Sequence, residues 1–212
     1  MTLQASQFPV LPRLLLATNN PGKAAEYRAL LEGCGWELVT PRDLGLNLEV
    51  EEAGTDYAEN ARMKAEAFAK GSGLVALADD SGIEVDALGG APGPLSARFG
   101  GDDISDRQRV ALLLERLKGV PPERRSARFR CLIAVARPEG QVSLFEGQCE
   151  GRVAEEPRGE GGFGYDPVFL LPERGLTLAE LPPEEKNAVS HRGRAARAAR
   201  VLLEGLLREC RV

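Results

Sequence analysis

What the chain lacks excludes several classes of protein. It has one histidine and four cysteines among 212 residues, and only 5% of its residues are aromatic. The cysteines (34, 131, 149 and 210) form no CxxC pair, so neither a disulfide scaffold nor a cysteine-bound zinc site is expected. No apolar run approaches the roughly 18 residues that a membrane-spanning helix needs. Residues 1–13 lack the basic start and apolar middle of a secretory signal, so we expect an N-terminal extension on a cytoplasmic protein.

An excess of basic charge is also missing. The formal net charge is −5, so bulk attraction to nucleic acid or to an anionic membrane is not expected. With a single histidine, His191, any bound metal should be a hard cation held by carboxylates, and Mg²⁺ is the first candidate. The 43% of hydrophobic residues is close to the average for a folded globular domain.

Strand-like and helix-like patterns alternate along the chain, and no linker divides it. We therefore expect one domain over residues 1–212, of the α/β class, with a mixed sheet flanked by helices and two lobes around a central cleft. Strands are predicted at 14–17, 36–39, 74–78, 128–136, 142–145, 148–153 and 168–171, and helices from about 23, after 56, after 105 and over 190–210.

The first segment whose residues could bind a ligand joins a predicted strand to a predicted helix. It consists of Thr18, Asn19, Asn20, Pro21, Gly22 and Lys23. Free N–H groups and the dipole at a helix N-terminus favour a bound anion, and Lys23 adds a full positive charge. It is not a Walker A loop, because Ala24 stands where that loop needs Ser or Thr. An ordinary turn uses the same residue types, so phosphate binding and a plain turn are both open.

Acidic residues mark a second segment. Asp79, Asp80, Ser81 and Gly82 are predicted to follow the apolar strand 74–78, at the edge where ligands of open α/β sheets gather. Two adjacent acids beside a buried strand are costly unless they meet a cation or hydrogen-bond donors. The alternative is a turn in which one of these side chains is only a cap. The pair at 51–52 could meet this segment across a cleft, although by itself it is typical of surface acids.

Two later segments could enclose a ligand. Glycines on both sides of Phe163 allow close backbone approach and expose an aromatic face, unless Phe163 simply enters the core. Ser190 as a helix cap would place His191 and Arg192 in the first turn, where cations oppose the helix dipole. That placement indicates an anionic or electron-rich ligand facing them, with a purely structural histidine as the alternative.

Five segments in this order resemble the inosine triphosphate pyrophosphatase family, which hydrolyses non-standard purine nucleoside triphosphates. They are ATNNPGK, EEAGTDYAENARMKA, ADDSGIEVDALGGAPGPLSARFGG, GGFGYDPVF and EKNAVSHRGRA, and the resemblance covers about residues 14–207. It implies an elongated mixed α/β fold with two lobes, a homodimer, and a Mg²⁺-dependent reaction that converts a nucleoside triphosphate and water into the monophosphate and pyrophosphate.

The resemblance also implies roles for individual residues. The segment from Thr18 to Lys23 would grip the triphosphate, Glu51 (with Glu52 the weaker choice) and Asp80 would hold Mg²⁺, and Asp80 would also be the general base. Lys64 and Ser81 would contact phosphate or ribose. Seven residues would enclose the purine base: Phe163, Gly164, Tyr165, Asp166, Lys186, His191 and Arg192.

Base selectivity follows from hydrogen-bond polarity. Hypoxanthine and xanthine carry a carbonyl at position six and an N–H at position one, whereas adenine presents the reverse. Donors from His191 or Arg192 would suit the carbonyl, and Asp166 could accept the N–H. Such a site can reject the mismatched base by roughly 10⁴-fold, because its polar groups are left unpaired.

Other functions stay open at this point. A septum-formation-inhibitor-like pyrophosphatase would act on other nucleotides, and a nucleotide-sensing module would bind without hydrolysis. RNA binding through an arginine-bearing face of the last helix (Arg194, Arg197 and Arg200) is a third possibility, which the acidic total opposes.

Overall fold

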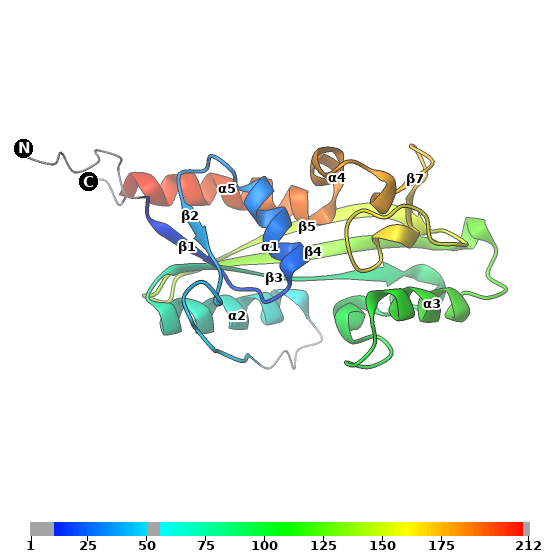
Figure 1. The fold of residues 1–212 in the computed structure, drawn as a ribbon, viewed down its shortest axis with the longest axis horizontal. Helices are drawn as coiled ribbons and strands as arrows, with labels where there is room; N and C mark the ends of the chain where they lie inside the picture. The colour runs from blue at the N-terminus through cyan, green and yellow to red at the C-terminus, as the bar shows by residue number, and fades with distance from the viewer. Residues whose placement is uncertain (1–10, 51–55, 210–212) are drawn as a thin grey trace, which may run out of the picture.

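The computed structural model describes residues 11–50 and 56–209, and within them seven strands form one mixed sheet (Figure 1). The strands lie side by side in the order β2-β1-β3-β4-β5-β6-β7; β1 is parallel to β2 and β3, and the remaining neighbours are antiparallel. Their bounds are β1 Arg13–Leu16, β2 Glu37–Val39, β3 Val75–Val85, β4 Ser126–Ala136, β5 Val142–Val153, β6 Phe169–Leu171 and β7 Leu176–Thr177.

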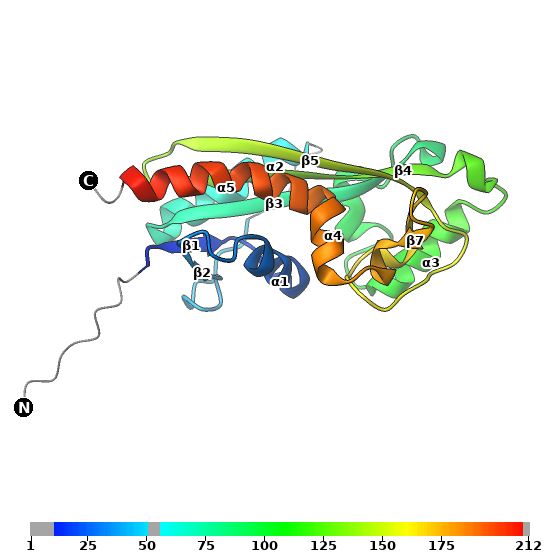
Figure 2. The same cartoon turned by 90° about the horizontal axis from the view of Figure 1, so that it is seen from above.

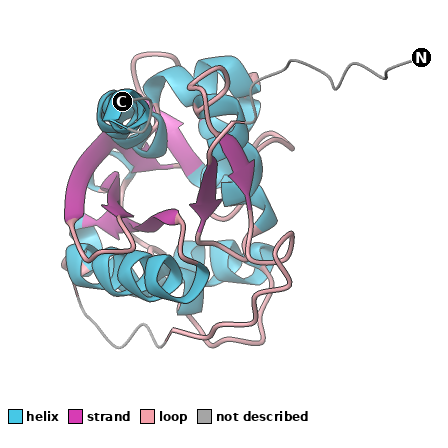
Figure 3. Ribbon diagram, turned by 90° about the vertical axis from the view of Figure 1, so that its left-hand side faces the viewer, coloured by secondary structure: helices cyan, strands magenta, loops and turns pink. Residues whose placement is uncertain are grey.

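Helices cover both faces of the sheet, as the end view in Figure 3 shows. One apolar cluster joins α1 and α5 to the face that carries Leu14 and Ile133. Another joins α2 to the opposite face, which carries Leu15 and Ala134. The α-helices are α1 Pro21–Leu30, α2 Tyr57–Ser72, α3 Asp106–Arg116, α4 Pro183–Val189 and α5 His191–Glu209. Of the helices described, none is long and apolar enough to cross a membrane.

The molecule is elongated and has two lobes, and the long strands β3, β4 and β5 run through both of them (Figure 2). The lobe that holds β1 and β2 is packed by α1, α2 and α5. The other lobe has its own apolar cluster, which includes Ile83, Leu113 and Phe169 from β3, α3 and β6. The predicted class, a mixed sheet flanked by helices in two lobes, is confirmed.

The prediction that Asp79–Gly82 follows a strand was wrong, because these residues lie inside β3. Pairing with β1 ends at Leu77, but pairing with β4 continues from Ala76 to Val85 and keeps the backbone extended. Beyond Leu77 this edge of β3 has no partner strand among the paired strands, so the segment faces the space where β1 ends and α1 begins. The site therefore lies at the carboxyl end of β1 and not of β3.

Smaller differences concern element ends. The strands predicted at 142–145 and 148–153 are one strand, β5, which pairs with β4 from Val142 to Arg152. The first helix begins at Pro21 instead of about Lys23, because Asn20 caps it and proline is well suited to the first helical position. The predicted caps Asp56 and Ser105 are confirmed; each accepts a hydrogen bond from a backbone N–H in the first turn of its helix.

Candidate active site

A cleft of about 890 Å³ is lined by residues of both lobes. Most of the predicted site residues face it, whereas Pro21, Gly22 and Lys186 do not line it. Glu51 and Glu52 lie outside the described residues. The predicted residues that line the cleft are Thr18, Asn19, Asn20, Lys23, Lys64, Asp80, Ser81, Phe163, Gly164, Tyr165, Asp166, His191 and Arg192.

Positive charge gathers where β1 meets α1. Lys23 Nζ lies 3.0 Å from Asp79 Oδ1, and Lys64 Nζ of α2 donates to the Asp79 carbonyl at 2.7 Å. The turn itself is held by its side chains: Thr18 Oγ1 accepts from the Asn20 N–H, and Asn20 Oδ1 accepts from the Lys23 N–H. Two lysines therefore flank the unpaired edge of β3, beside the N-terminus of α1, where an anion is favoured.

The two acids of β3 point to opposite faces of the sheet, as alternation along a strand requires. Asp80 faces α2, where its Oδ2 accepts from Asn60 Nδ2 at 2.9 Å, while its Oδ1 accepts from the Ser81 N–H at 3.0 Å. These two bonds fix the plane of a carboxylate that is 5% exposed and lines the cleft. Asp80 is therefore oriented before any ligand arrives.

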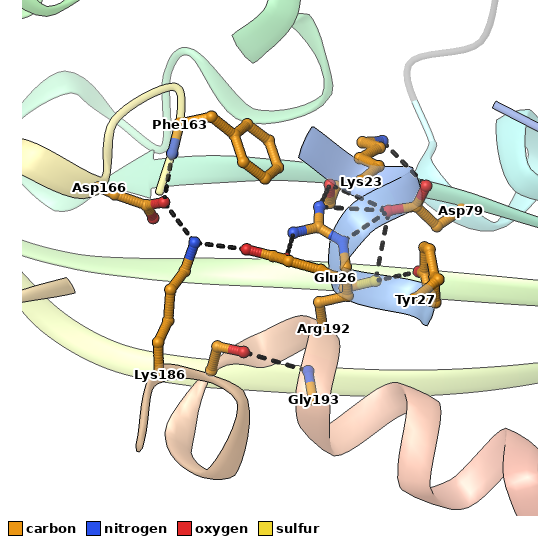
Figure 4. A network of polar contacts seen from close by, with 12 residues as sticks. Lys23, Glu26, Tyr27, Asp79, Phe163, Asp166, Lys186, Arg192 and Gly193 are labelled. Carbon is orange, nitrogen blue, oxygen red and sulfur yellow. Dashed lines mark hydrogen bonds and ion pairs between the residues drawn. The ribbon is translucent and has the colours of Figure 1, made fainter. Parts of the chain in front are cut away.

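Asp79 faces the other way and is the centre of a buried ion network (Figure 4). Its Oδ2 lies 3.3 Å from both Nε and Nη2 of Arg192, and its Oδ1 pairs with Lys23. Burial raises the pKa of this carboxyl, but the charges of Lys23, Arg192 and Lys64 outweigh that effect and hold the pKa well below its usual range. The sequence indicated that Asp79 and Asp80 need a cation or hydrogen-bond donors, or that a residue of this segment caps a turn. It gave Asp79 no partner of its own, because nothing local shows which face of the strand it occupies.

Glu26 is the second acid of the network, and sequence reasoning missed it. Arg192 Nη1 donates to Glu26 Oε2 at 2.6 Å, and Lys186 Nζ bridges Glu26 and Asp166. Burial raises the pKa of Glu26, while Arg192 and Lys186 lower it by more, so the net direction is downward. Its place in the sequence could have indicated a role, because Glu26 lies three residues after Lys23 and therefore on the same face of α1.

This network explains the cations in the first turn of α5. We expected a ligand to face His191 and Arg192, but Arg192 is compensated by protein carboxylates from α1 and β3. Four of its five N–H groups are used by Glu26, Asp79 and Ser81. Ser190 does cap the helix, since its Oγ accepts from the Gly193 N–H at 3.1 Å.

Another part of the cleft wall combines an aromatic ring with polar groups. The Phe163 ring lies against α1, where a Cβ at Gly22 would come within 2.6 Å of its Cδ1. The Phe163 N–H donates to Asp166 Oδ2 at 2.8 Å. Burial, the largest effect on Asp166, raises the pKa of its carboxyl despite the nearby Lys186. This Asp166 oxygen thus already has two partners, the Phe163 N–H and Lys186 Nζ.

His191 forms the adjoining wall. Its ring stacks on Phe129, with 4.5 Å between centroids and 11° between planes. Burial, followed by the charges of Arg192 and Lys186, lowers the pKa of His191 well below its usual range, so the ring is neutral at pH 7. Its Nδ1 is buried without a hydrogen-bond partner among the described residues. A neutral imidazole with one unsatisfied nitrogen is suited to a hydrogen bond from or to a base edge.

The arrangement fits a hard cation beside a bound phosphate. Mg²⁺ is usually held by one or two carboxylates together with water and substrate phosphates, and not by a protein cage. Within residues 11–50 and 56–209 no group of three or more His, Cys, Asp or Glu forms such a cage. Asp80, a fixed carboxylate on the wall of the cleft that Lys23 and Lys64 also line, has the donor chemistry that this mode of binding needs.

Comparison with known sequences decides the family. The model of the Ham1 family matches residues 14–201. The chain belongs to the Ham1 family. A Ham1 relative from Desulforamulus reducens, named dITP/XTP pyrophosphatase, is 52% identical over 194 residues, which are 92% of this chain and 96% of the relative. A Bacillus subtilis protein with the same name is 45% identical over 195 residues, 92% of this chain and 98% of its own.

Solved structures agree with this membership. A HAM1 protein from Coxiella burnetii has a TM-score of 0.82 and 40% identity, over 91% of this chain and 98% of the other. A nucleoside-triphosphatase, also titled dITP/XTP pyrophosphatase, from Mycobacterium abscessus has a TM-score of 0.69 and 46% identity, over 88% and 98% of the two chains. The cleft of the present Ham1 protein therefore lies in a fold shared along nearly its whole length.

Proposed function

We propose that this Ham1 protein hydrolyses non-standard purine nucleoside triphosphates (ITP, dITP and XTP) to the monophosphate and pyrophosphate, and that residues 1–212 act as one catalytic domain. The observation that carries the proposal is the position of Asp80. Its carboxylate is fixed on the β3 edge and lines the same cleft as Lys23 and Lys64 and as the polar groups of Asp166, His191 and Arg192. The names of its relatives support the same reaction.

The phosphate end would bind the leaving group. A nucleoside triphosphate carries about four negative charges, and charge builds on the pyrophosphate as its bond to the inner phosphorus breaks. Lys23 and Lys64 stand beside the N-terminus of α1, with their positions set by contacts to Asp79. Fixed donors of this kind stabilise developing charge without having to reorganise during the reaction.

Asp80 would serve the attacking water. Asp80 and Glu51 are the proposed holders of Mg²⁺, which when bound supplies charge neutralisation and makes water more acidic. We also assign Asp80 as the acceptor of the water proton. The Asn60 amide and the Ser81 N–H each bond one carboxylate oxygen and hold the plane of the group, and Asp80 lines the cleft in which the water would stand.

The base pocket would choose the substrate by polarity. We assign the six-carbonyl to a donor from His191, with the remaining N–H of Arg192, and the N1–H to Asp166. Adenine has a donor at position six and an acceptor at position one, so the donors of the pocket would face a donor and the Asp166 carboxylate would face an acceptor. These unpaired groups in a buried site would cost much of the binding energy. Lys186 contributes from behind this wall, because it holds Asp166 and Glu26 in place instead of lining the cleft.

The deciding experiment is pyrophosphate release from ITP with Mg²⁺ by the wild type and by Asp80→Asn. We expect the variant to lose roughly 10²- to 10⁴-fold in rate, the usual worth of a positioned acid–base group. Asp43→Asn, an exposed acid that does not line the cleft, is the control and should keep the wild-type rate. Equal rates for Asp80→Asn and wild type would refute the role of Asp80. A wild type that binds ITP without releasing pyrophosphate would instead indicate a nucleotide sensor.

We also propose that the protein is a cytoplasmic homodimer. The dimer rests on the family resemblance, and sedimentation equilibrium should then give a mass near twice 22.8 kDa. The cysteines that the structure describes are Cys34, Cys131 and Cys149, all buried free thiols, which suits a reducing compartment. A monomeric mass at assay concentration would contradict the dimer.

A further inference from the structure

Arg109 lines the cleft but has no place in the reaction described so far. It lies on α3 in the second lobe, and its side chain is 11% exposed. Nη2 donates to the carbonyls of Gly101 and Asp102 at 3.1 and 3.4 Å, and Nη1 lies 3.4 Å from Asp106 Oδ1. These contacts pin the guanidinium from two sides.

The Nε–H of Arg109 is left over. It is buried, and it has no hydrogen-bond partner in the described part of the chain. Only three buried side-chain polar atoms there lack one, and two of them, Arg109 Nε and His191 Nδ1, belong to residues that line this cleft. A buried donor without an acceptor is costly, so an acceptor supplied by a ligand would remove that cost.

The contacts also give Arg109 a position relative to the base pocket. The loop from Phe163 to Asp166 is tied on one side to the network of Lys186 and on the other to α3. On the first side Lys186 pairs with Asp166, and on the second Asp106 Oδ2 accepts from the Gly164 N–H at 2.9 Å. Followed from contact to contact, Asp166 and its loop therefore link the network of Arg192, next to His191 in the chain, with Asp106 and Arg109 on α3.

That order of contacts matches the edge of a purine base. Going round the ring from the six-carbonyl one meets the N1–H and then the substituent at position two. Hypoxanthine has hydrogen there, xanthine a carbonyl and guanine an amino group. An arginine side chain has only donors and is always charged, so it favours the xanthine carbonyl and opposes the guanine amino group. A nucleotide xanthine also loses a ring proton near neutral pH, which adds charge attraction.

We infer that Arg109 is a specificity-determining residue that reads position two of the base, favouring XTP over ITP and excluding GTP. The inference rests on the proposed function, because it needs the base edge to face the loop that holds Asp166. It adds a task that His191, Arg192 and Asp166 cannot perform, since hypoxanthine, xanthine and guanine are alike at positions one and six.

The test compares kcat/KM for XTP, ITP and GTP in the wild type and Arg109→Ala. Loss of the loop contacts should lower the ITP value a few-fold. The XTP value should fall by roughly a further 10- to 100-fold, as expected for a hydrogen bond from a charged donor, and GTP should gain relative to ITP. Arg107→Ala removes an exposed arginine from the same helix and should leave the three ratios at their wild-type values.

The outcomes separate the hypotheses. An equal fall for XTP and ITP means that Arg109 only holds the loop, and it overturns the inference while the proposed function stands. A wild type that hydrolyses none of the three refutes the proposed function itself. If Arg109→Ala does not fold, Arg109→Gln keeps a long side chain without the charge, and the same loss of XTP preference is then required of it.

Discussion

At the scale of residues, the site depends on two carboxylates, Asp79 and Glu26, that do not line the cleft. Asp79 is 2% exposed and binds Lys23 and Arg192, which line the cleft. Buried charges are tolerated when each has a partner, and removing one partner leaves the other uncompensated. The chemistry of the cleft therefore depends on residues behind its wall.

Asp79→Asn should test this dependence. The change keeps the shape of the side chain but leaves Arg192 without one of its buried partners, so the free energy of unfolding should fall by about 3–5 kcal/mol. Urea unfolding, with the midpoint and slope both fitted, measures it. Asp43→Asn removes the charge of an exposed pair with Arg28 and keeps a side-chain oxygen that can accept from Thr40, so it is expected to change stability little. Similar stabilities for the two variants would show that the network contributes no more than a surface pair.

At the scale of elements, the site depends on how closely α5 packs on β5. Gly147 of β5 faces the start of α5, where an added Cβ would lie 2.1 Å from the His191 carbonyl oxygen and 2.5 Å from the Ala195 N. Only a residue without a side chain allows this approach, which brings His191 and Arg192 to the cleft. The glycine thus sets the position of the base pocket.

Gly147→Ala should therefore move α5 or strain β5. We expect a loss of about 1–3 kcal/mol in unfolding free energy, as for other overpacked sites, and weaker substrate binding because His191 shifts. Gly205 lies in α5, and a Cβ added there meets nothing within 4 Å. Gly205→Ala should therefore raise the free energy of unfolding by about 0.5–1 kcal/mol through helix propensity. Thermal unfolding and KM measure both effects; a neutral Gly147→Ala would mean that the helix adjusts without cost.

At the scale of the whole molecule, one histidine dominates the response to mildly acidic pH. His191 is the only histidine in the chain, and it is buried and neutral in the folded protein. In the unfolded chain its pKa returns to about 6.5. Below that pH the unfolded state binds a proton that the folded state does not, so stability must decrease as the pH falls.

We expect the wild type to lose up to about 1.4 kcal/mol of unfolding free energy per pH unit between pH 6.5 and 5, and His191→Gln to lose clearly less. Urea unfolding at several pH values gives both slopes. Asp166, whose pKa burial raises, is present in both proteins, so its effect largely cancels in the difference. Parallel slopes would show that His191 is charged in the folded protein.

Local patterns determined much of this protein. The apolar runs predicted β1 to β6, although not the second half of β3, and missed β7. Asp56 and Ser105 predicted two helix starts, and the five motifs predicted the family that the comparison then identified. These features depend on neighbours within a few residues, since caps and periodicity are local properties of the backbone.

Only the tertiary structure decided the roles of Asp79, Glu26 and Arg109. Asp79 and Asp80 are adjacent in sequence, yet pairing of β3 with β4 sends one to the ion network and the other to the cleft. Glu26 meets Arg192 across 166 positions, and Arg109 reaches the same cleft from the other lobe. Such contacts are set by strand register and by which helices share a face, and neither is encoded in the residues that surround each position along the chain.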